Sequence, residues 1–204
     1  NLHTFLSGAR DLLKKMPDFS PPEIINHVEA KSRVLPVPVQ SFEPPDCHEQ
    51  RIERSIVWNH RWEYDKNPAD FFQACYILQS KNIPFQLLVM GQQFRQHPEE
   101  FDRAKSELQE HIIVWGEQST EDYLYWLERG EFAVSTAIHE FQGVALMEAV
   151  RAGNIPVVPD RLSYPEFFPK QYRFGQSAED LADFLEACLE AKQLFPPDLK
   201  SFSW

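Results

Sequence analysis

Two glutamates that flank seven residues, Glu140 and Glu148, have the spacing in this chain that best suits chemistry. Glu140 follows an apolar run typical of a buried strand, and Glu148 lies in an apolar stretch with helical spacing. We therefore expect one carboxylate in a turn and the other inside the next helix. A buried carboxylate needs a partner, and ribose hydroxyls can provide one. The alternative is a solvent-facing or capping Glu140 and an ordinary polar Glu148; we favour function for this pair.

The turn after Glu140 has features of a phosphate site. Gly143 allows close approach of the backbone to a ligand, and the first amides of the next helix lack helical partners. Such amides, at the positive end of the helix dipole, suit an anion. Because ligands of open α/β sheets bind at the carboxyl ends of strands, we predict a nucleotide-sized ligand here.

Two cations, Arg61 and Lys66, are expected in the loop after an earlier strand. Arginine forms forked bonds to phosphate oxygens and lysine adds a point charge, so the pair could stabilise a leaving nucleoside diphosphate. The alternative is a set of solvent-exposed loop charges paired with Glu63 and Asp65. For these cations taken alone, we favour that alternative.

Other polar and aromatic residues give weaker indications. His139 and His60 adjoin candidate residues, and we interpret them as orienting side chains. Trp115 and Gly116 lie at the end of an expected strand. There the tryptophan could stack on a nucleotide base or pack in the core, and we give the two interpretations equal weight. Tyr123 is interpreted as a core residue. None of the seven histidines has the spacing of a metal site, so we expect no metal.

The composition indicates a globular intracellular protein. Of the 204 residues, 43% are apolar, and no run is long enough to span a bilayer. The widely spaced cysteines 47, 75 and 188 suit a reducing compartment, and we expect the cytoplasm, with the nucleus as a further location. A net charge of −11 argues against a broad nucleic-acid footprint.

Strand and helix patterns alternate from residue 54 onward. The expected strands are 55–59, 85–91, 112–116, 132–137, 155–159 and 172–175. The expected helices are 68–81, 98–109, 120–129, 143–152 and 177–192. This alternation predicts an α/β fold with a Rossmann-like parallel sheet and helices on both faces.

The first fifty residues differ from the rest. Helices are expected at 2–16 and near 22–30, and the proline-rich segment 34–50 is typical of a linker. We predict that residues 51–204 form a nucleotide-sugar (donor) binding domain. We also expect the natural chain to extend beyond both ends of this sequence.

Four motifs, together with the paired glutamates, resemble a known enzyme family. They are residues 60–66, 135–141, 164–166 and 202–204. Over about residues 34–204 the chain resembles the C-terminal, donor-binding half of family-4 retaining glycosyltransferases, which have the GT-B fold. More narrowly, the motifs are similar to those of the tRNA-queuosine α-mannosyltransferases. The resemblance implies that residues 1–33 are a remnant of the N-terminal, acceptor-binding domain.

The resemblance also implies roles for individual residues. Arg61 and Lys66 would hold the donor diphosphate, and Glu148 the ribose. Glu140 and the 141–145 loop would hold the transferred sugar and its phosphate. The candidate catalytic residues are thus Arg61, Lys66 and Glu140. The candidate donor-binding residues are Glu148, Trp115, Gly116, His139, Phe141, Gly143, Val144 and Ala145.

The narrower family implies GDP-mannose as donor, without a metal or other cofactor, and queuosine in a tRNA for aspartate as acceptor. We expect the tRNA to be contacted mainly through the N-terminal domain, no membrane partner, and no transfer by this chain alone. Three alternatives remain: a non-catalytic nucleotide-binding module, a family-4 enzyme with another donor and acceptor, and an epimerase or phosphorylase of the same architecture.

Overall fold

The structure is a computed structural model that describes residues 2–16, 21, 23–35, 37–39, 51–94, 96–191 and 196–197. The chain divides into two compact units, residues 1–37 and 38–204. Most of the expected linker, 34–50, lies outside the described residues, as does the 202–204 motif. The domain boundaries therefore stay predictions.

The first unit contains two helices. They are α1 (Leu2–Lys15) and α2 (Glu23–Lys31), close to the expected bounds. A surface ion pair of 2.5 Å between Arg10 and Glu29 joins them. Leu6 of α1 and Ile25 of α2 are buried, whereas Phe5 and Leu12 of α1 are exposed.

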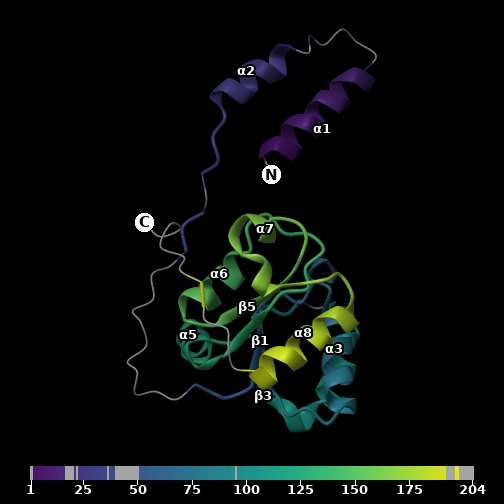
Figure 1. Cartoon of the computed structure of the whole chain (residues 1–204), viewed down its shortest axis with the longest axis vertical. Coiled ribbons are helices and arrows are strands. Elements are labelled where there is room, and N and C mark those ends of the chain that lie inside the picture. Colours follow the sequence, from purple (N-terminus) through teal and green to yellow (C-terminus); the bar gives the residue numbers. More distant parts are fainter. Residues whose placement is uncertain are drawn as a thin grey trace. The chain divides into compact units, whose positions relative to one another are not determined.

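The second unit contains a six-stranded parallel sheet (Figure 1). Its strands are β1 (Ser55–Trp58), β2 (Gln86–Met90), β3 (Ile112–Gly116), β4 (Phe132–Val134), β5 (Ile155–Pro159) and β6 (Arg173–Phe174). Their order is β3-β2-β1-β4-β5-β6, and Val57 of β1 pairs with Leu88 of β2 and Ala133 of β4. This doubly wound order reverses direction at β1 and confirms the predicted fold class.

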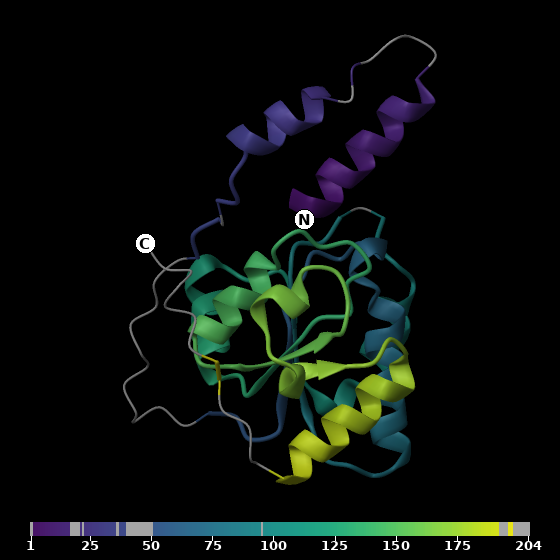
Figure 2. The ribbon, with the colours of Figure 1, turned by 45° about the horizontal axis from the view of Figure 1, so that its top comes forward.

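Helices cover both faces of this sheet. The helical segments are η1 (Tyr64–Lys66), α3 (Pro68–Ser80), α4 (Glu100–Glu107), η2 (Gln109–His111), α5 (Thr120–Arg129), α6 (Val144–Arg151), α7 (Tyr164–Phe167), η3 (Lys170–Tyr172) and α8 (Ala178–Ala191). α3 and α8 pack together on one side, and α5 and α6 on the other (Figures 1 and 2). Two of the helices begin where the sequence predicts. Pro68 is the first residue of α3, and at the start of α5 the Ser119 hydroxyl accepts a hydrogen bond from the Asp122 amide.

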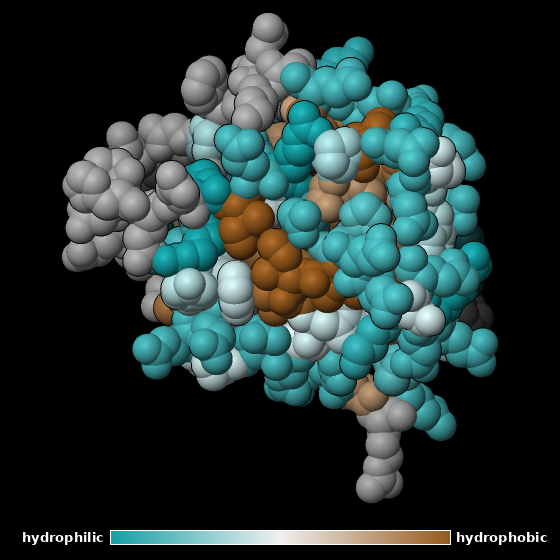
Figure 3. Space-filling model, turned by 90° about the horizontal axis from the view of Figure 1, so that it is seen from below, coloured by the Kyte–Doolittle hydropathy of each residue, from teal (hydrophilic) through white to brown (hydrophobic). Residues whose placement is uncertain are grey.

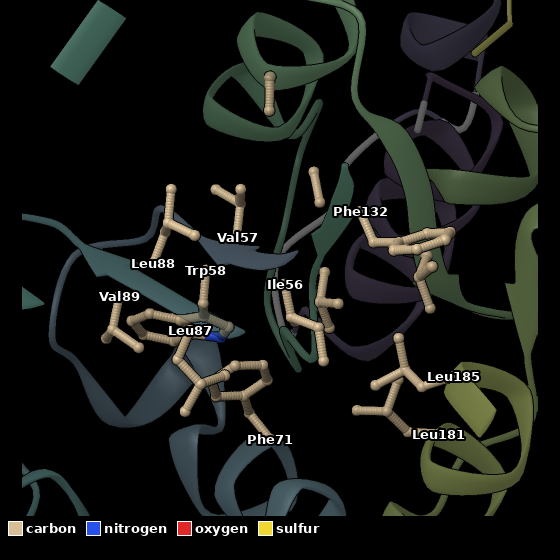
Figure 4. Close-up of a cluster of buried hydrophobic side chains, with 14 of the residues drawn as sticks. Ile56, Val57, Trp58, Phe71, Leu87, Leu88, Val89, Phe132, Leu181 and Leu185 are labelled. Carbon is tan, nitrogen blue, oxygen red and sulfur yellow. The ribbon is translucent and has the colours of Figure 1, made fainter. Parts of the chain in front are cut away.

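The core lies between these layers. Every residue of β1 is fully buried, as expected for a central strand covered on both faces. Successive side chains point to opposite faces: Val57 lies on one, while Ile56 and Trp58 lie on the other, toward Phe71 of α3 and Leu185 of α8 (Figure 4). This packing anchors β1, whose following loop carries Lys66.

The expected strand 132–137 is too long, because β4 ends at Val134. Beyond Val134 the hydroxyls form bonds outside the sheet ladder. Ser135 Oγ lies 2.6 Å from the Tyr164 hydroxyl, and Thr136 Oγ1 donates to the Lys66 carbonyl at 2.8 Å. These bonds tie the end of β4 to α7 and to the loop after β1. The short helix α7 itself was not predicted.

The face seen from the side opposite to α7 is largely hydrophilic, with a hydrophobic patch near its centre (Figure 3). No helix within the described ranges is long and apolar enough to cross a membrane.

Candidate active site

The loops after β1 and β4 meet where the strand order reverses. β1 and β4 are adjacent and parallel, so their carboxyl ends lie at one edge of the sheet. Lys66 lies in the first loop and Glu140 in the second. In sheets of this kind that edge is the ligand-binding position.

Lys66 is the buried link between the two loops. Only 10% of its side chain is exposed. Nζ donates to the His139 carbonyl at 3.1 Å and to Glu140 Oε2 at 3.3 Å. Asp65 Oδ2 lies 3.2 Å from the same Nζ. A buried ammonium group needs such acceptors, and they bring three predicted site residues together: Lys66, His139 and Glu140.

Glu140 is held as a carboxylate. Burial acts to raise its pKa, but the Lys66 charge, the Gly143 amide and the bond from Lys66 outweigh burial and lower it. The Phe141 amide also donates to Oε1 at 3.0 Å. At neutral pH this group is therefore ionised and already bound by three donors.

The turn from Glu140 into α6 presents backbone donors. Gly143 is the N-cap, with φ of 78°, and a Cβ there would lie 3.3 Å from the Tyr164 ring. The first helical bond runs from Met147 to Gly143, so the Val144 and Ala145 amides precede the helical ladder. These amides at the start of α6 give the turn the form of an anion site.

Glu148 lies further along α6 and is half-buried. Burial raises its pKa, although a 2.8 Å bond from the Tyr123 hydroxyl acts in the opposite direction. Tyr123 in turn accepts from Asn59 Nδ2 at 2.9 Å, and the same nitrogen donates to the Ala145 carbonyl at 2.7 Å. The carboxylate is thus fixed by a chain of bonds.

Two residues of this chain, Asn59 and Tyr123, were not predicted as site residues. Tyr123 was assigned to the core, yet burial and the Glu148 charge raise the pKa of its hydroxyl, so it remains a proton donor. Asn59 carried a usable signal, because it is the first polar residue after an apolar strand, at its carboxyl end. No sequence pattern paired it with Tyr123.

Arg61 is not brought to Lys66 by any bond between the described residues. Its guanidinium pairs with Glu63 at 2.9 Å, and 55% of its side chain is exposed. This is the solvent-paired arrangement that we favoured for the cations taken alone. A diphosphate contact by Arg61 stays a prediction.

Trp115 packs into an aromatic cluster. Its ring is stacked on Phe72, with centroids 5.9 Å apart, and lies edge-on to Trp62 at 5.4 Å. Gly116 next to it has a positive φ of 99°. The ring contacts favour the core interpretation of Trp115, and contact of either residue with a base stays a prediction.

His60 follows β1 and is buried beside the site. Burial and the nearby Lys66 charge lower its pKa to about 4. Its ring lies edge-on to Trp58 at 5.1 Å. The side chain is therefore neutral at pH 7, which agrees with an orienting role and not with that of a cationic phosphate ligand.

The described parts of the chain hold no group of three His, Cys, Asp or Glu residues placed to bind a metal ion.

The fold and this edge of the sheet define a class: the Rossmann-like, C-terminal half of a GT-B glycosyltransferase. The chain belongs to the family of glycosyl transferases group 1, whose model matches residues 50–194. Residues 1–39 match a second model, tRNA-queuosine alpha-mannosyltransferase N-terminal.

Curated relatives agree with this assignment. The chain is 33% identical over 187 residues to tRNA-queuosine alpha-mannosyltransferase of Drosophila melanogaster, covering 87% of this chain and 50% of the relative. It is 23% identical over 142 residues to GDP-mannose:cellobiosyl-diphosphopolyprenol alpha-mannosyltransferase of Xanthomonas oryzae pv. oryzae, covering 69% and 37%. The chain thus spans half the length, or less, of these relatives.

Among solved structures, the chain is similar to the pneumococcal O-GlcNAc transferase GtfA in complex with UDP and GlcNAc. The TM-score is 0.64 at 14% identity, over 77% of this chain and 32% of the other. At this identity the likeness concerns the fold alone.

Proposed function

We propose that this chain is the donor-binding half of a retaining mannosyltransferase that uses GDP-mannose and acts on queuosine in tRNA. The observation that carries the proposal is the Lys66–Glu140 pair beside the start of α6, at the ligand-binding edge of a glycosyltransferase fold. The names of two relatives support the donor, the sugar and the acceptor.

In this reaction the bond between the sugar C1 and the diphosphate oxygen breaks, and its electron pair leaves with GDP. A bond then forms from C1 to the acceptor hydroxyl oxygen, whose proton passes to the departing diphosphate oxygen. Negative charge grows on the diphosphate, so Lys66 and the first amides of α6 stabilise the transition state more than the ground state. Glu140 holds Lys66 and faces the sugar, and Glu148 accepts from the ribose hydroxyls.

The test is Lys66→Ala, assayed for mannosyl transfer in the full-length protein. Loss of one such charge stabiliser should lower kcat by about 100-fold or more. Lys105→Ala, on the exposed side of α4, is the matched lysine control and should retain activity. Melting curves of both variants exclude unfolding as the cause. Near-normal kcat in Lys66→Ala would refute the assigned role.

Donor identity is tested separately by the melting temperature of this chain with GDP, UDP, ADP and their sugar conjugates. A ligand that binds only the folded state stabilises it by RT ln(1 + L/Kd), where L is the free ligand concentration, so at equal concentration the tighter ligand raises the melting temperature more. GDP and GDP-mannose should give the largest shifts. A larger shift with UDP would indicate another family member's donor, and no shift with any nucleotide would contradict donor binding.

A further inference from the structure

A cavity of about 490 Å³ lies beside the candidate active site. Its walls come from the segments after β1, β2 and β4, and include Trp62, Tyr64, Asp65, Phe94 and His139. Of the candidate donor-site residues, its described lining includes His139 but not Lys66, Glu140 or Glu148. The volume suits a ligand about as large as a nucleoside.

Aromatic rings form part of the walls, beside acidic and polar side chains. Tyr64 is 74% exposed and Phe94 is 39% exposed, so both rings present apolar surface to solvent. Trp62 is buried and stacks on Phe101 with centroids 3.9 Å apart and planes 7° apart, which holds that wall rigid. A flat ligand would cover the exposed rings.

The charges of the lining disfavour a phosphate. Glu63 and Asp65 both line the cavity. Their carboxylates pair with Arg61 at 2.9 Å and with Lys66 at 3.2 Å, so neither carboxylate lacks a counter-charge. The described lining residues themselves include two acids and no lysine or arginine. An aromatic base therefore suits this cavity better than an anionic group does.

The cavity shares a wall with the diphosphate site. His139 lines it, and the His139 carbonyl accepts from Lys66 Nζ. Asp65 also lines it, and the Asp65 carbonyl accepts from the Ile138 amide at 2.8 Å. The lining residue His139 directly precedes Glu140 in the chain, so the cavity adjoins the turn that carries this carboxylate.

We infer that the cavity binds the acceptor: an unpaired RNA base, stacked between Tyr64 and Phe94, with its sugar-accepting group toward Glu140. This inference rests on the proposed function and adds an acceptor subsite within the donor-binding half. Proteins recognise unpaired RNA bases by stacking them on aromatic side chains and by contacts to the base edge. Single-base capture also agrees with a net charge of −11, which disfavours extensive contacts with the RNA backbone.

The test uses full-length protein and a tRNA that carries queuosine. Tyr64→Ala and Phe94→Ala should each weaken tRNA binding, and raise KM for tRNA, by about 5- to 100-fold, as expected for loss of one stacking contact. GDP affinity, measured by calorimetry, should stay within about twofold of wild type, because neither ring belongs to the donor groups. Tyr64→Trp restores a stacking surface and should recover most of the tRNA affinity.

Tyr125→Ala is the matched aromatic control. Tyr125 is exposed on α5 and does not line the cavity. It should leave tRNA affinity and KM unchanged. Unaltered tRNA binding by both cavity variants, or an equal loss in Tyr125→Ala, would overturn the inference.

If the proposed function is wrong, a different result is expected: wild-type protein transfers no mannose from GDP-mannose to the tRNA. Because tRNA binding is measured directly, the effect of Tyr64→Ala on binding still decides the cavity's role. A wild-type protein that does not bind the tRNA at all would overturn the inference as well.

Discussion

The Tyr123 hydroxyl links α5 to Glu148 by a hydrogen bond. It donates to this carboxylate at 2.8 Å and accepts from Asn59. Tyr123→Phe removes that donor while Asn59 keeps its bond to the Ala145 carbonyl. Since a bond to a charged acceptor contributes about 1.5 kcal/mol or more, we expect GDP affinity to fall about tenfold by calorimetry.

The same variant should show a pH signature. The bond from Tyr123 acts to lower the pKa of Glu148, against the effect of burial, so its loss raises that pKa further. The ionised fraction then falls sooner as the pH decreases, and the loss of GDP affinity should be larger at pH 5 than at pH 7.5. Tyr125→Phe is the control. An equal loss at both pH values would mean that Tyr123 supports only the packing of α5.

His60 should make the protein acid-sensitive. Its pKa in the folded state is about 4, through burial and the Lys66 charge, whereas an unfolded histidine titrates near 6.5. Between these values the unfolded state binds the proton and the folded state does not, so stability is lost as the pH falls. From pH 7.5 to pH 4, wild type should lose about 3 kcal/mol more of its free energy of unfolding than His60→Gln does. Denaturant titrations at both pH values measure this difference, and identical losses would contradict it.

At the residue scale, the sequence indicates which side chains could carry chemistry, but not which of them contact one another. Lys66, Glu140 and Glu148 were singled out as candidates because cations and acids stand out after apolar runs. Lys66 and its partner Glu140 lie in two different loops, 74 positions apart in the sequence. A local sequence pattern cannot indicate a contact between residues so far apart. Tyr123 was missed for the same reason: helical spacing in α5 indicates a buried face but not that a hydroxyl on it meets a carboxylate of α6.

At the element scale, the ends of β1 and β2 approach so closely that Gly91 has no room for a side chain. Its φ is 148°, and a Cβ would overlap the His60 carbonyl oxygen. This is a backbone clash that no rotamer relieves, so Gly91→Ala should cost about 2 to 4 kcal/mol of stability in a denaturant titration. Displacement of the two loops should also weaken tRNA binding by the cavity.

Gly8→Ala provides the control. No atom lies within 4 Å of a Cβ built at Gly8, which lies inside α1. That change should stabilise the helix by about 0.5 to 1 kcal/mol. If Gly91→Ala were as well tolerated, the loops would have to separate without cost, and they would not be rigid walls of the cavity.

Sequence predicted the sheet better than it predicted the ends of its elements. β3, β5 and α5 match the expected bounds, because apolar runs and a Ser119 cap define them. β4 ends early since the hydroxyls of Ser135 and Thr136 bond to other segments. α7 has four residues, too few for a helical period to show in a sequence. The errors thus gather at the carboxyl edge, where tertiary bonds replace local preference.

At the scale of the whole molecule, charge limits what this chain can do with RNA. It has 31 acidic and 20 basic residues, and the face seen in Figure 3 is largely hydrophilic. Tight RNA binding depends on neutralising many phosphates, whereas the proposed subsite captures one base. In the proposed enzyme, affinity for tRNA therefore comes mainly from other parts of the protein, while this chain positions the acceptor against the donor.

This division predicts that the present chain alone binds tRNA weakly, with a Kd above about 10⁻⁴ M at physiological salt, because its net charge repels the phosphate backbone. Fluorescence anisotropy with labelled tRNA measures the affinity. Calorimetry with GDP on the same sample shows that the donor site is folded, so a lack of RNA binding cannot be attributed to damaged protein. The full-length protein, assayed in parallel, should bind at least about 100-fold more tightly. Micromolar binding by the chain alone would contradict the division, because it would require a phosphate-binding surface on an acidic domain.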